Sequence, residues 1–232
     1  MNTVLVAVAA VAVVAWFAAG TIWNVRKGSA LMRWMQDGGP AGELRGELRG
    51  ELRGELRGGL RALGERTTVR WLGSTAVEMA LRDTKAPFTG VTLVIFLEAR
   101  DLPWMWALGR SRGRRDTLII RAVLSRSPAL EFEALDPLSW SGRDALPRVP
   151  RDWLLREAAP PGSLVVLHAS AGALARADEL LALAERAGLA VKRLSLRRAE
   201  PNLQIHVALP DGRQPAREFF EAVHALAKLA LN

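Results

Sequence analysis

The chain has 232 residues, half of which are apolar, so it can bury one hydrophobic core or two small ones, and a large multidomain enzyme is excluded. It contains no cysteine, which excludes disulfides, cysteine-ligated zinc, iron–sulfur clusters and thiol nucleophiles. The net charge of +8 comes mostly from arginine and favours anionic partners, either phospholipid headgroups or nucleic acid phosphates, although an arginine excess also fits a GC-rich genome.

The stretch from Val4 to Trp23, VLVAVAAVAVVAWFAAGTIW, is the strongest feature of the sequence. It holds about 20 residues without a charge, enough for a helix to cross a hydrocarbon core of roughly 30 Å. A secretory signal peptide has a basic N-terminal region and an apolar run of about 7–15 residues, whereas the leading Met-Asn-Thr carries no positive side chain. Ala18-Ala19-Gly20 resembles only a poor cleavage site, so we predict an uncleaved signal-anchor, which is a single-pass transmembrane helix.

A basic and aromatic flank completes the anchor region, which we assign to residues 1–36. The residues expected at the membrane interface are Trp23, Arg26, Lys27, Arg33 and Trp34. Indole rings favour the headgroup level, and Lys and Arg beside a span mark its cytoplasmic side. We therefore expect the N-terminus outside the cell membrane and the rest of the chain in the cytoplasm. The segment Ser29–Gln36 is either an interfacial extension of the helix or a plain stop-transfer flank.

Four copies of Glu-Leu-Arg-Gly occupy the Gly-rich segment that we assign to residues 37–64. In a helix, like charges would recur at i,i+4 and oppose it by about 0.2–0.5 kcal/mol per pair, and each glycine would cost about 1 kcal/mol. In a strand, half of the uncharged face would be glycine, which packs poorly. We predict a solvated spacer that spans about 22 Å as a coil or about 24 Å as a helix. An expanded nucleotide repeat tolerated in a loop is the other interpretation.

An antiparallel β region is expected at residues 65–136, because short connections separate runs rich in β-branched and apolar residues. The expected strands are Thr67–Gly73, Thr75–Arg82, Phe88–Glu98, Thr117–Leu124 and Ala129–Leu135. In ALEFEAL the apolar and acidic residues alternate, as a sheet with one wet face requires. A Pro-rich crossing segment, residues 137–163, follows and is pinned by Trp140 and Trp153. It is a candidate boundary between two subdomains.

Residues 164–232 are predicted to have the order βαββα, which makes the whole fold α+β. The expected elements are strand Leu164–His168, helix Ala171–Ala187 closed by Gly188, strands Leu189–Leu196 and Leu203–Leu209, and a last helix over Pro215–Leu231. This order matches most of a ferredoxin-like βαββαβ unit without its final strand. It is a likeness of element order alone and implies no family.

The sequence contains one catalytic candidate, Ser170, at a predicted strand-to-helix turn. Ser170, Asp211 and His224 follow the chain order of a hydrolase triad, and the turn resembles a Gly-x-Ser-x-Gly elbow in which His168 replaces the first glycine. The simpler interpretation is that Ser170 caps the following helix. His206 and His224 are expected to be structural, because no histidine spacing favours a metal site. No nucleotide-binding motif is present, so we expect no cofactor and no metal.

Two tryptophans and an arginine cluster interrupt the β region between the strands that end near Glu98 and begin at Thr117. Asp101 is a candidate cap and Gly109 a candidate end for a short helix over Leu102–Leu108. The expected membrane- or partner-docking residues are Trp104, Trp106, Arg110, Arg112, Arg114 and Arg115. Indoles beside arginines suit an anionic membrane surface. The other interpretation is a hydrophobic plug that covers the end of the sheet.

The sequence therefore predicts a single-pass membrane-anchored protein whose cytoplasmic α+β domain is a non-catalytic binding or scaffolding module at the membrane surface. The expected partners are the lipid bilayer, with its anionic headgroups, or a membrane protein; nucleic acid is less favoured. Two alternatives stay open at this stage. One is a membrane-tethered serine hydrolase that uses Ser170, and the other is a basic nucleic-acid-binding domain held at the membrane.

Overall fold

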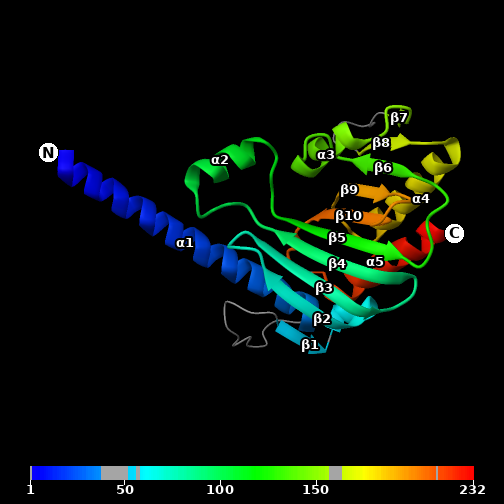
Figure 1. Ribbon diagram of the computed structural model, residues 1–232, viewed down its shortest axis with the longest axis horizontal. Coiled ribbons are helices and arrows are strands. Elements are labelled where there is room, and N and C mark those ends of the chain that lie inside the picture. The colour runs from blue at the N-terminus through cyan, green and yellow to red at the C-terminus, as the bar shows by residue number, and fades with distance from the viewer. Residues whose placement is uncertain (1, 38–51, 56–57, 157–163, 213) are drawn as a thin grey trace.

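The centre of the molecule is one antiparallel sheet, which a computed structural model describes together with its helices over residues 2–37, 52–55, 58–156, 164–212 and 214–232 (Figure 1). In this described part, the strands are β1 (Leu52–Glu55), β2 (Gly64–Trp71), β3 (Ala76–Thr84), β4 (Phe88–Phe96), β5 (Thr117–Leu124), β6 (Phe132–Leu135), β7 (Leu154–Arg156), β8 (Val165–His168), β9 (Val191–Leu196) and β10 (Leu203–Ala208). Their spatial order is β1-β2-β3-β4-β5-β10-β9-β6-β8-β7.

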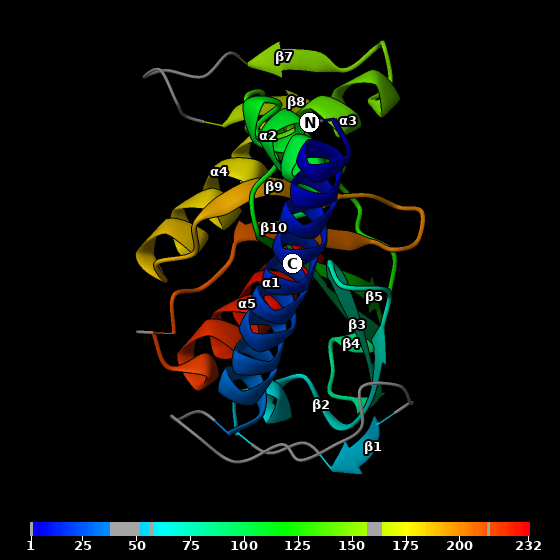
Figure 2. The same cartoon turned by 90° about the vertical axis from the view of Figure 1, so that its left-hand side faces the viewer.

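Helices cover one face of this sheet and extend from one end of it (Figures 1 and 2). The helical elements are α1 (Asn2–Asp37), η1 (Gly58–Ala62), α2 (Pro103–Ser111), α3 (Trp140–Ala145), η2 (Leu146–Arg148), α4 (Ala171–Arg186) and α5 (Ala216–Leu231). The helices α4 and α5 pack on one face, α3 lies at the other face near β6 and β9, and the N-terminal half of α1 projects away from the domain.

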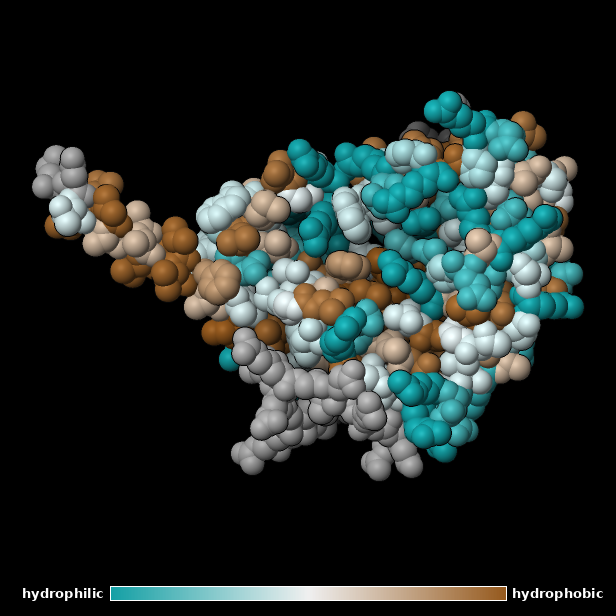
Figure 3. All heavy atoms as spheres, in the orientation of Figure 1, coloured by the Kyte–Doolittle hydropathy of each residue, from teal (hydrophilic) through white to brown (hydrophobic). Residues whose placement is uncertain are grey.

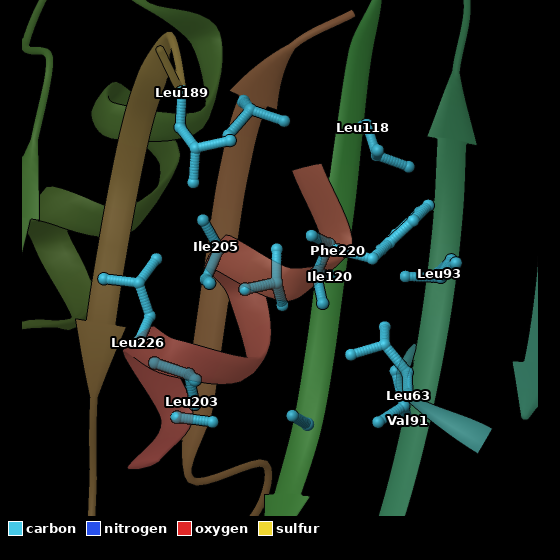
Figure 4. Close-up of a cluster of buried hydrophobic side chains, with 14 of the residues drawn as sticks. Leu63, Val91, Leu93, Leu118, Ile120, Leu189, Leu203, Ile205, Phe220 and Leu226 are labelled. Atoms are coloured by element: carbon cyan, nitrogen blue, oxygen red, sulfur yellow. The ribbon is translucent and has the colours of Figure 1, made fainter. Parts of the chain in front are cut away.

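The hydrophobic core lies between the sheet and α5 (Figure 4). Alternate residues of β5 and β10, such as Ile120 and Ile205, point toward Phe220 and Leu226 of α5 and are fully buried. This alternation is the period of two that a strand imposes on its side chains. Burying each such side chain stabilises the fold by about 1.5–3 kcal/mol.

The C-terminal half of α1 belongs to this core, whereas its N-terminal half does not. Leu31, Met32 and Met35 are buried and join the core cluster, while Val4 to Val14 are exposed in the projecting half, where apolar side chains gather along the helix (Figure 3). Between Thr3 and Gln36, α1 is long and apolar enough to cross a membrane. A signal sequence near an N-terminus meets the same criteria of length and composition. One continuous helix is therefore both an apolar projection and a structural part of the domain.

The α+β class and the antiparallel sheet are confirmed, but the ferredoxin-like order is not. In the observed sheet β6 lies between β8 and β9 and pairs with both, so β10 is not the neighbour of β8 that the ferredoxin-like order requires. The strands before and after the Pro-rich segment also share one sheet, because β5 pairs with β10. The Pro-rich segment itself contains α3, η2 and the edge strand β7.

Four residues of the repeat, Leu52–Glu55, which join the third copy to the fourth, form the edge strand β1 and pair with β2. The edge of β2 supplies backbone partners that a solvated coil lacks, which is why this segment is a strand despite its glycine. At the C-terminal end of the predicted spacer, Gly58–Ala62 form η1, and Leu60 and Leu63 are fully buried in the core. Residues 38–51 and 56–57 of the predicted spacer lie outside the described residues.

The sheet face opposite α4 and α5 carries polar side chains that are nevertheless buried. Glu133 is fully buried and accepts hydrogen bonds from Arg193, from Ser195 Oγ at 2.8 Å and from Arg197 Nη2 at 3.0 Å. His206 is also buried, and neither ring nitrogen has a hydrogen-bond partner among the described residues. Burial, with the nearby charges of Arg193 and Arg121, lowers the pKa of His206 to about 3.

We predict that protonation of His206 makes the fold sensitive to mild acid. The unfolded chain takes up a proton near pH 6.5, whereas the folded chain resists it down to about pH 3, so stability is full above pH 6.5 and falls as the pH drops below it. Between pH 7 and pH 4.5 the loss is roughly 2.5 kcal/mol. Urea unfolding of the full chain in detergent, followed by tryptophan fluorescence, measures it. In His206→Leu this part of the pH dependence should disappear, and an unchanged slope would contradict the assignment.

Candidate membrane-docking surface

Polar side chains of α1 attach it to the sheet where β4 ends and β5 begins. The indole Nε1 of Trp16 donates to the carbonyl of Arg100 at 2.8 Å, and Asn24 Nδ2 donates to the carbonyl of Glu98 at 3.0 Å. Lys27 Nζ lies 2.5 Å from Asp116 Oδ2. Because Asn24 is fully buried, its amide would be costly to leave unpaired in an otherwise apolar helix. These contacts fix α1 to the connection between β4 and β5.

Gly20 allows α1 to touch the backbone of this connection directly. A Cβ atom at Gly20 would lie 2.3 Å from the carbonyl oxygen of Arg100, closer than any side chain can approach. The atom in the way belongs to the backbone, so a larger residue cannot be accommodated by a side-chain rotation. The crossing point of α1 therefore depends on glycine at this position.

A buried ion pair between Arg100 and Asp116 holds the connection in place. Arg100 donates from Nη1 to Asp116 Oδ1 at 3.0 Å and from Nη2 to Oδ2 at 2.8 Å, and the backbone N–H of Glu98 donates to Oδ1 at 2.7 Å. Burial alone would raise the pKa of Asp116, but the hydrogen bonds from Arg100, Lys27 and the Glu98 backbone outweigh it and lower that pKa. Burial likewise opposes the charge of Arg100, yet Asp116 and Glu98 raise its pKa. Both groups are therefore kept ionised.

The helix α2 differs at both ends from the sequence prediction. It begins at Pro103, which suits the first turn because it needs no backbone N–H donor, and its N-cap is Leu102 with no side-chain cap. Asp101 instead accepts a hydrogen bond from Ser74 Oγ at 2.6 Å. Gly109 lies inside the helix, and the chain reverses at Gly113, whose φ of +72° favours glycine.

One side of α2 is attached to the sheet through Glu98. The indole Nε1 of Trp106 donates to Glu98 Oε2 at 2.5 Å, and Arg110 and Arg100 approach the same oxygen at 3.6 and 3.5 Å. The guanidinium of Arg110 also lies over the Trp106 ring, 5.5 Å from its centroid. Glu98 is 6% exposed, so its charge is balanced by these neighbours rather than by water.

The other side of α2 presents apolar side chains to solvent. Trp104 is 57% exposed, Met105 43% and Leu108 46%, and α2 contains no buried residue. The alternative of a hydrophobic plug over the sheet end therefore does not hold. Met105 and Leu108 are three residues apart and Trp104 and Leu108 four, so the three side chains share one side of the helix. We use the name α2 surface for these three side chains together with Arg112, Arg114 and Arg115.

Three arginines, Arg112, Arg114 and Arg115, directly follow the C-terminal end of α2. Arg114 lies over the Trp140 ring at 5.7 Å, and Arg115 donates to the backbone carbonyls of Arg110 and Arg114 at 2.9 Å. Among the residues that the structure describes, no carboxylate pairs with Arg112, Arg114 or Arg115. The cluster therefore keeps positive charge that is available to an external anion.

The residues predicted at the membrane interface lie in two different environments. Trp23, 62% exposed, and Arg26 point into solvent. Lys27 pairs with Asp116, and Arg33 is half-buried. Trp34 Nε1 donates to the carbonyl of Gln214 at 2.8 Å, and its ring packs edge-on against Phe219 at 5.5 Å. The structure thus uses Lys27 and Trp34 to join α1 to the domain.

Ser170 serves as a helix cap in this structure. Its Oγ accepts the backbone N–H of Ala173 at 3.2 Å, as an N-cap residue does at the start of α4. His224, which the hydrolase interpretation pairs with Ser170, instead contacts the carbonyl of Ala86 through Nε2 at 2.7 Å and packs beside Phe88. The structure gives these two side chains separate partners.

Comparison with known proteins finds no family model that matches this sequence and no curated protein with significant similarity to it. The interpretation of the α2 surface therefore depends on its geometry alone.

We predict that Gly20→Ala separates α1 from the domain. The added methyl group meets the Arg100 carbonyl, so the helix must shift and the hydrogen bonds of Trp16 and Asn24 are lost. The expected destabilisation is about 2 kcal/mol, the usual scale for a buried contact of this kind. Urea unfolding in detergent measures it, and the exposed neighbour Ala19→Leu is the matched control. Equal stability of the two variants would show that the close approach is not needed.

Proposed function

We propose that this chain is a single-pass membrane protein whose domain is held against the bilayer by two attachments, the anchor α1 and the α2 surface, and acts there as a non-catalytic binding or scaffolding module. The observation that carries the proposal is the exposure of Trp104, Met105 and Leu108 beside the point where α1 leaves the domain. Both views of the molecule place α2 and the projecting half of α1 at the same end of the sheet (Figures 1 and 2).

The length of a membrane span supports this placement. About 20 helical residues cross the hydrocarbon core, so a span that begins at Thr3 would reach to about Ile22. Gly20 lies near the end of that stretch and touches the backbone of Arg100, three residues before α2 begins. The α2 surface is therefore expected at the depth of the headgroups, where tryptophan side chains are favoured.

Charge supports the same orientation. Arg112, Arg114 and Arg115 have no carboxylate partner among the described residues, and each cation near an anionic leaflet contributes about 1 kcal/mol. Together with Arg26 and Arg33 of α1, they favour the cytoplasmic leaflet under the positive-inside rule. We propose that the N-terminus lies outside and that the domain faces the cytoplasm.

A weak contact by α2 is sufficient because the anchor keeps the surface close to the membrane. Because α1 is fixed to the domain, contact of the α2 surface with the same bilayer is an intramolecular event, and a contact that is weak in solution becomes effective. The contact sets the tilt of the domain relative to the membrane. The tilt in turn sets the direction of the sheet face opposite α4 and α5. Orientation of a binding face at the membrane is the role we assign to α2.

Amide hydrogen exchange of the full chain in lipid nanodiscs tests this function. We expect exchange in residues 102–111 to be slower, by about fivefold or more, in nanodiscs with anionic lipid than in detergent with no bilayer, because headgroups cover α2. The triple variant with Trp104→Ser, Met105→Ser and Leu108→Ser should lose this protection.

The matched control carries Leu154→Ser and Leu155→Ser, which removes exposed apolar side chains from the distant edge strand β7. Its α2 exchange should equal that of the wild type. Exchange in α2 that is the same with and without a bilayer would overturn the proposal. Recovery of the chain from membranes at a mass that begins after Gly20 would show instead that α1 is a cleaved signal sequence.

A further inference from the structure

A second surface lies on the sheet face opposite α4 and α5, over strands β2 to β5 and β10. Figure 1 looks onto this face, with α4 and α5 behind the sheet. Directly opposite residues of neighbouring antiparallel strands share a face, so the registers place one row of small and polar side chains across it. The row consists of Thr68, Ala80, Thr92, Arg121 and Gln204. All five are exposed or half-buried, so no element of the described chain covers this row.

Two arginines are direct cross-strand partners beside this row. Arg66 of β2 is opposite Arg82 of β3, two residues along the strands from Thr68 and Ala80 and therefore on the same face. Both arginines are exposed. Like charges at directly opposite positions destabilise an antiparallel pair. A local arrangement that opposes stability in this way indicates that positive charge is needed here for function.

The carboxylates of this region leave part of the positive charge uncompensated. Asp83 Oδ2 lies 2.5 Å from Arg66 Nε, and Glu78 Oε1 lies 3.5 Å from Arg70 Nη2. Glu65, the neighbour of Arg66 in β2, points to the other side of the strand. The nearby carboxylates are thus either paired with an arginine or turned away from the face.

Arg82 and Arg121 hold the free positive charge of the face. Among the described residues, no carboxylate pairs with either of them. Since Ala80, Thr92 and Arg121 are successive partners across β3, β4 and β5, the Cα atoms of the two arginines lie about 12 Å apart. Residues i and i+4 of an extended chain share one side and are separated by about 13 Å. The two arginines therefore match the spacing of acidic residues on one side of an extended segment.

Distance separates this face from the membrane. The helix α1 is attached where β4 ends and β5 begins, beside Phe96 and Thr117. Ala76 of β3 is opposite Phe96, so Arg82 lies six residues, or about 20 Å, further along the sheet. Electrostatic attraction is screened over about 8 Å at physiological ionic strength. Headgroups at the α2 surface would not reach Arg82.

The side chains of the face also distinguish a polypeptide from a nucleic acid. Single-stranded nucleic acids bind to surfaces on which aromatic side chains stack with the bases. Among the described residues of this face on β2 to β5 and β10, the aromatic side chain is Phe96, whose ring lies beside Trp140 with a centroid distance of 6.2 Å. The row between the free arginines consists of small side chains, which suits a flat, extended polypeptide.

We propose that Arg82 and Arg121 bind an extended acidic segment of a partner polypeptide, whose carboxylates at positions i and i+4 face the two guanidinium groups. A guanidinium group donates two parallel hydrogen bonds to a carboxylate, which gives such a contact both strength and direction. This inference rests on the proposed function, because it gives the membrane-held binding module its binding face and the chemistry of its partner.

Binding of a fluorescent oligoglutamate peptide of about ten residues tests the proposal. The full chain is placed in phosphatidylcholine nanodiscs, whose lipid carries no net charge, and anisotropy is measured at physiological ionic strength. We expect saturable binding that Arg82→Gln combined with Arg121→Gln weakens by about tenfold or more, since charge-assisted hydrogen bonds are lost. The urea midpoint of this variant should not fall, because Arg82→Gln relieves the repulsion by Arg66.

The matched control is Arg61→Gln combined with Arg186→Gln, which removes the same charge from exposed positions of η1 and α4 on the other side of the sheet. It should bind the peptide as the wild type does. Absence of saturable binding, or an equal loss in the two double variants, would overturn the proposal. Tighter binding of a single-stranded DNA of about ten nucleotides, lost in the Arg82 and Arg121 variant, would overturn it in favour of a nucleic acid.

Failure of this inference is distinguishable from failure of membrane docking. The triple serine variant of α2 should bind the peptide as the wild type does, because its substitutions lie at the other end of the sheet. The Arg82 and Arg121 variant should keep the slow amide exchange of α2 in anionic nanodiscs. Loss of that exchange protection together with peptide binding would show that the two arginines act on the whole domain, and would overturn the proposal.

Discussion

The carboxylate of Asp116 is the interaction on which the arrangement of this molecule depends. It binds Arg100, Lys27 and the backbone N–H of Glu98, so one side chain joins α1, the end of β4 and the start of β5. Asp116 is almost completely buried, and leaving one member of such a buried ionic group unpaired costs roughly 3–5 kcal/mol. The position of the apolar helix relative to the sheet is therefore fixed electrostatically as well as by packing.

This attachment determines what the exposed surfaces can do. Because α1 is held at Trp16, Gly20, Asn24 and Lys27, a membrane crossed by its N-terminal half would lie at the same end of the sheet as α2. Glu98 then holds α2 through Trp106, which leaves Trp104, Met105 and Leu108 free on the outer side. Rigid support behind an exposed apolar surface lowers the entropy that a contact with lipid must overcome.

Much of the fold could be predicted from the sequence, because the apolar residues repeat with the periods of strands and helices. The bounds of β5 agree with the prediction, and those of α4 and α5 agree to within a residue at each end. The insertion of β6 between β8 and β9 could not be predicted, since strand order depends on long-range pairing that a local pattern does not contain. The start of α2 was also missed, because Asp101 does not cap the helix and instead accepts a hydrogen bond from Ser74, which is remote in the sequence.

The candidate site was only partly visible for the same reason. The pattern of Trp104, Trp106 and four arginines located α2, but it left open which side chains are exposed. Glu98 and Asp116 went unnoticed although they border the insertion on both sides, and acidic residues at the ends of apolar strands were the available signal. Their importance comes from partners in α1 more than seventy residues away, such as Asn24 and Lys27.

The most direct test of this account is the depth of α2 in the bilayer. Since the chain has no cysteine, Met105→Cys introduces a single site for a nitroxide label, and Leu154→Cys on the edge strand β7 gives an exposed reference site on the domain. In anionic nanodiscs, power saturation with oxygen and a water-soluble nickel complex reports whether each label contacts lipid or water. We predict that the label at position 105 is accessible to oxygen and protected from nickel, and that the label at position 154 is accessible to nickel. A label at position 105 that is as accessible to nickel as one on an exposed soluble surface would contradict the account.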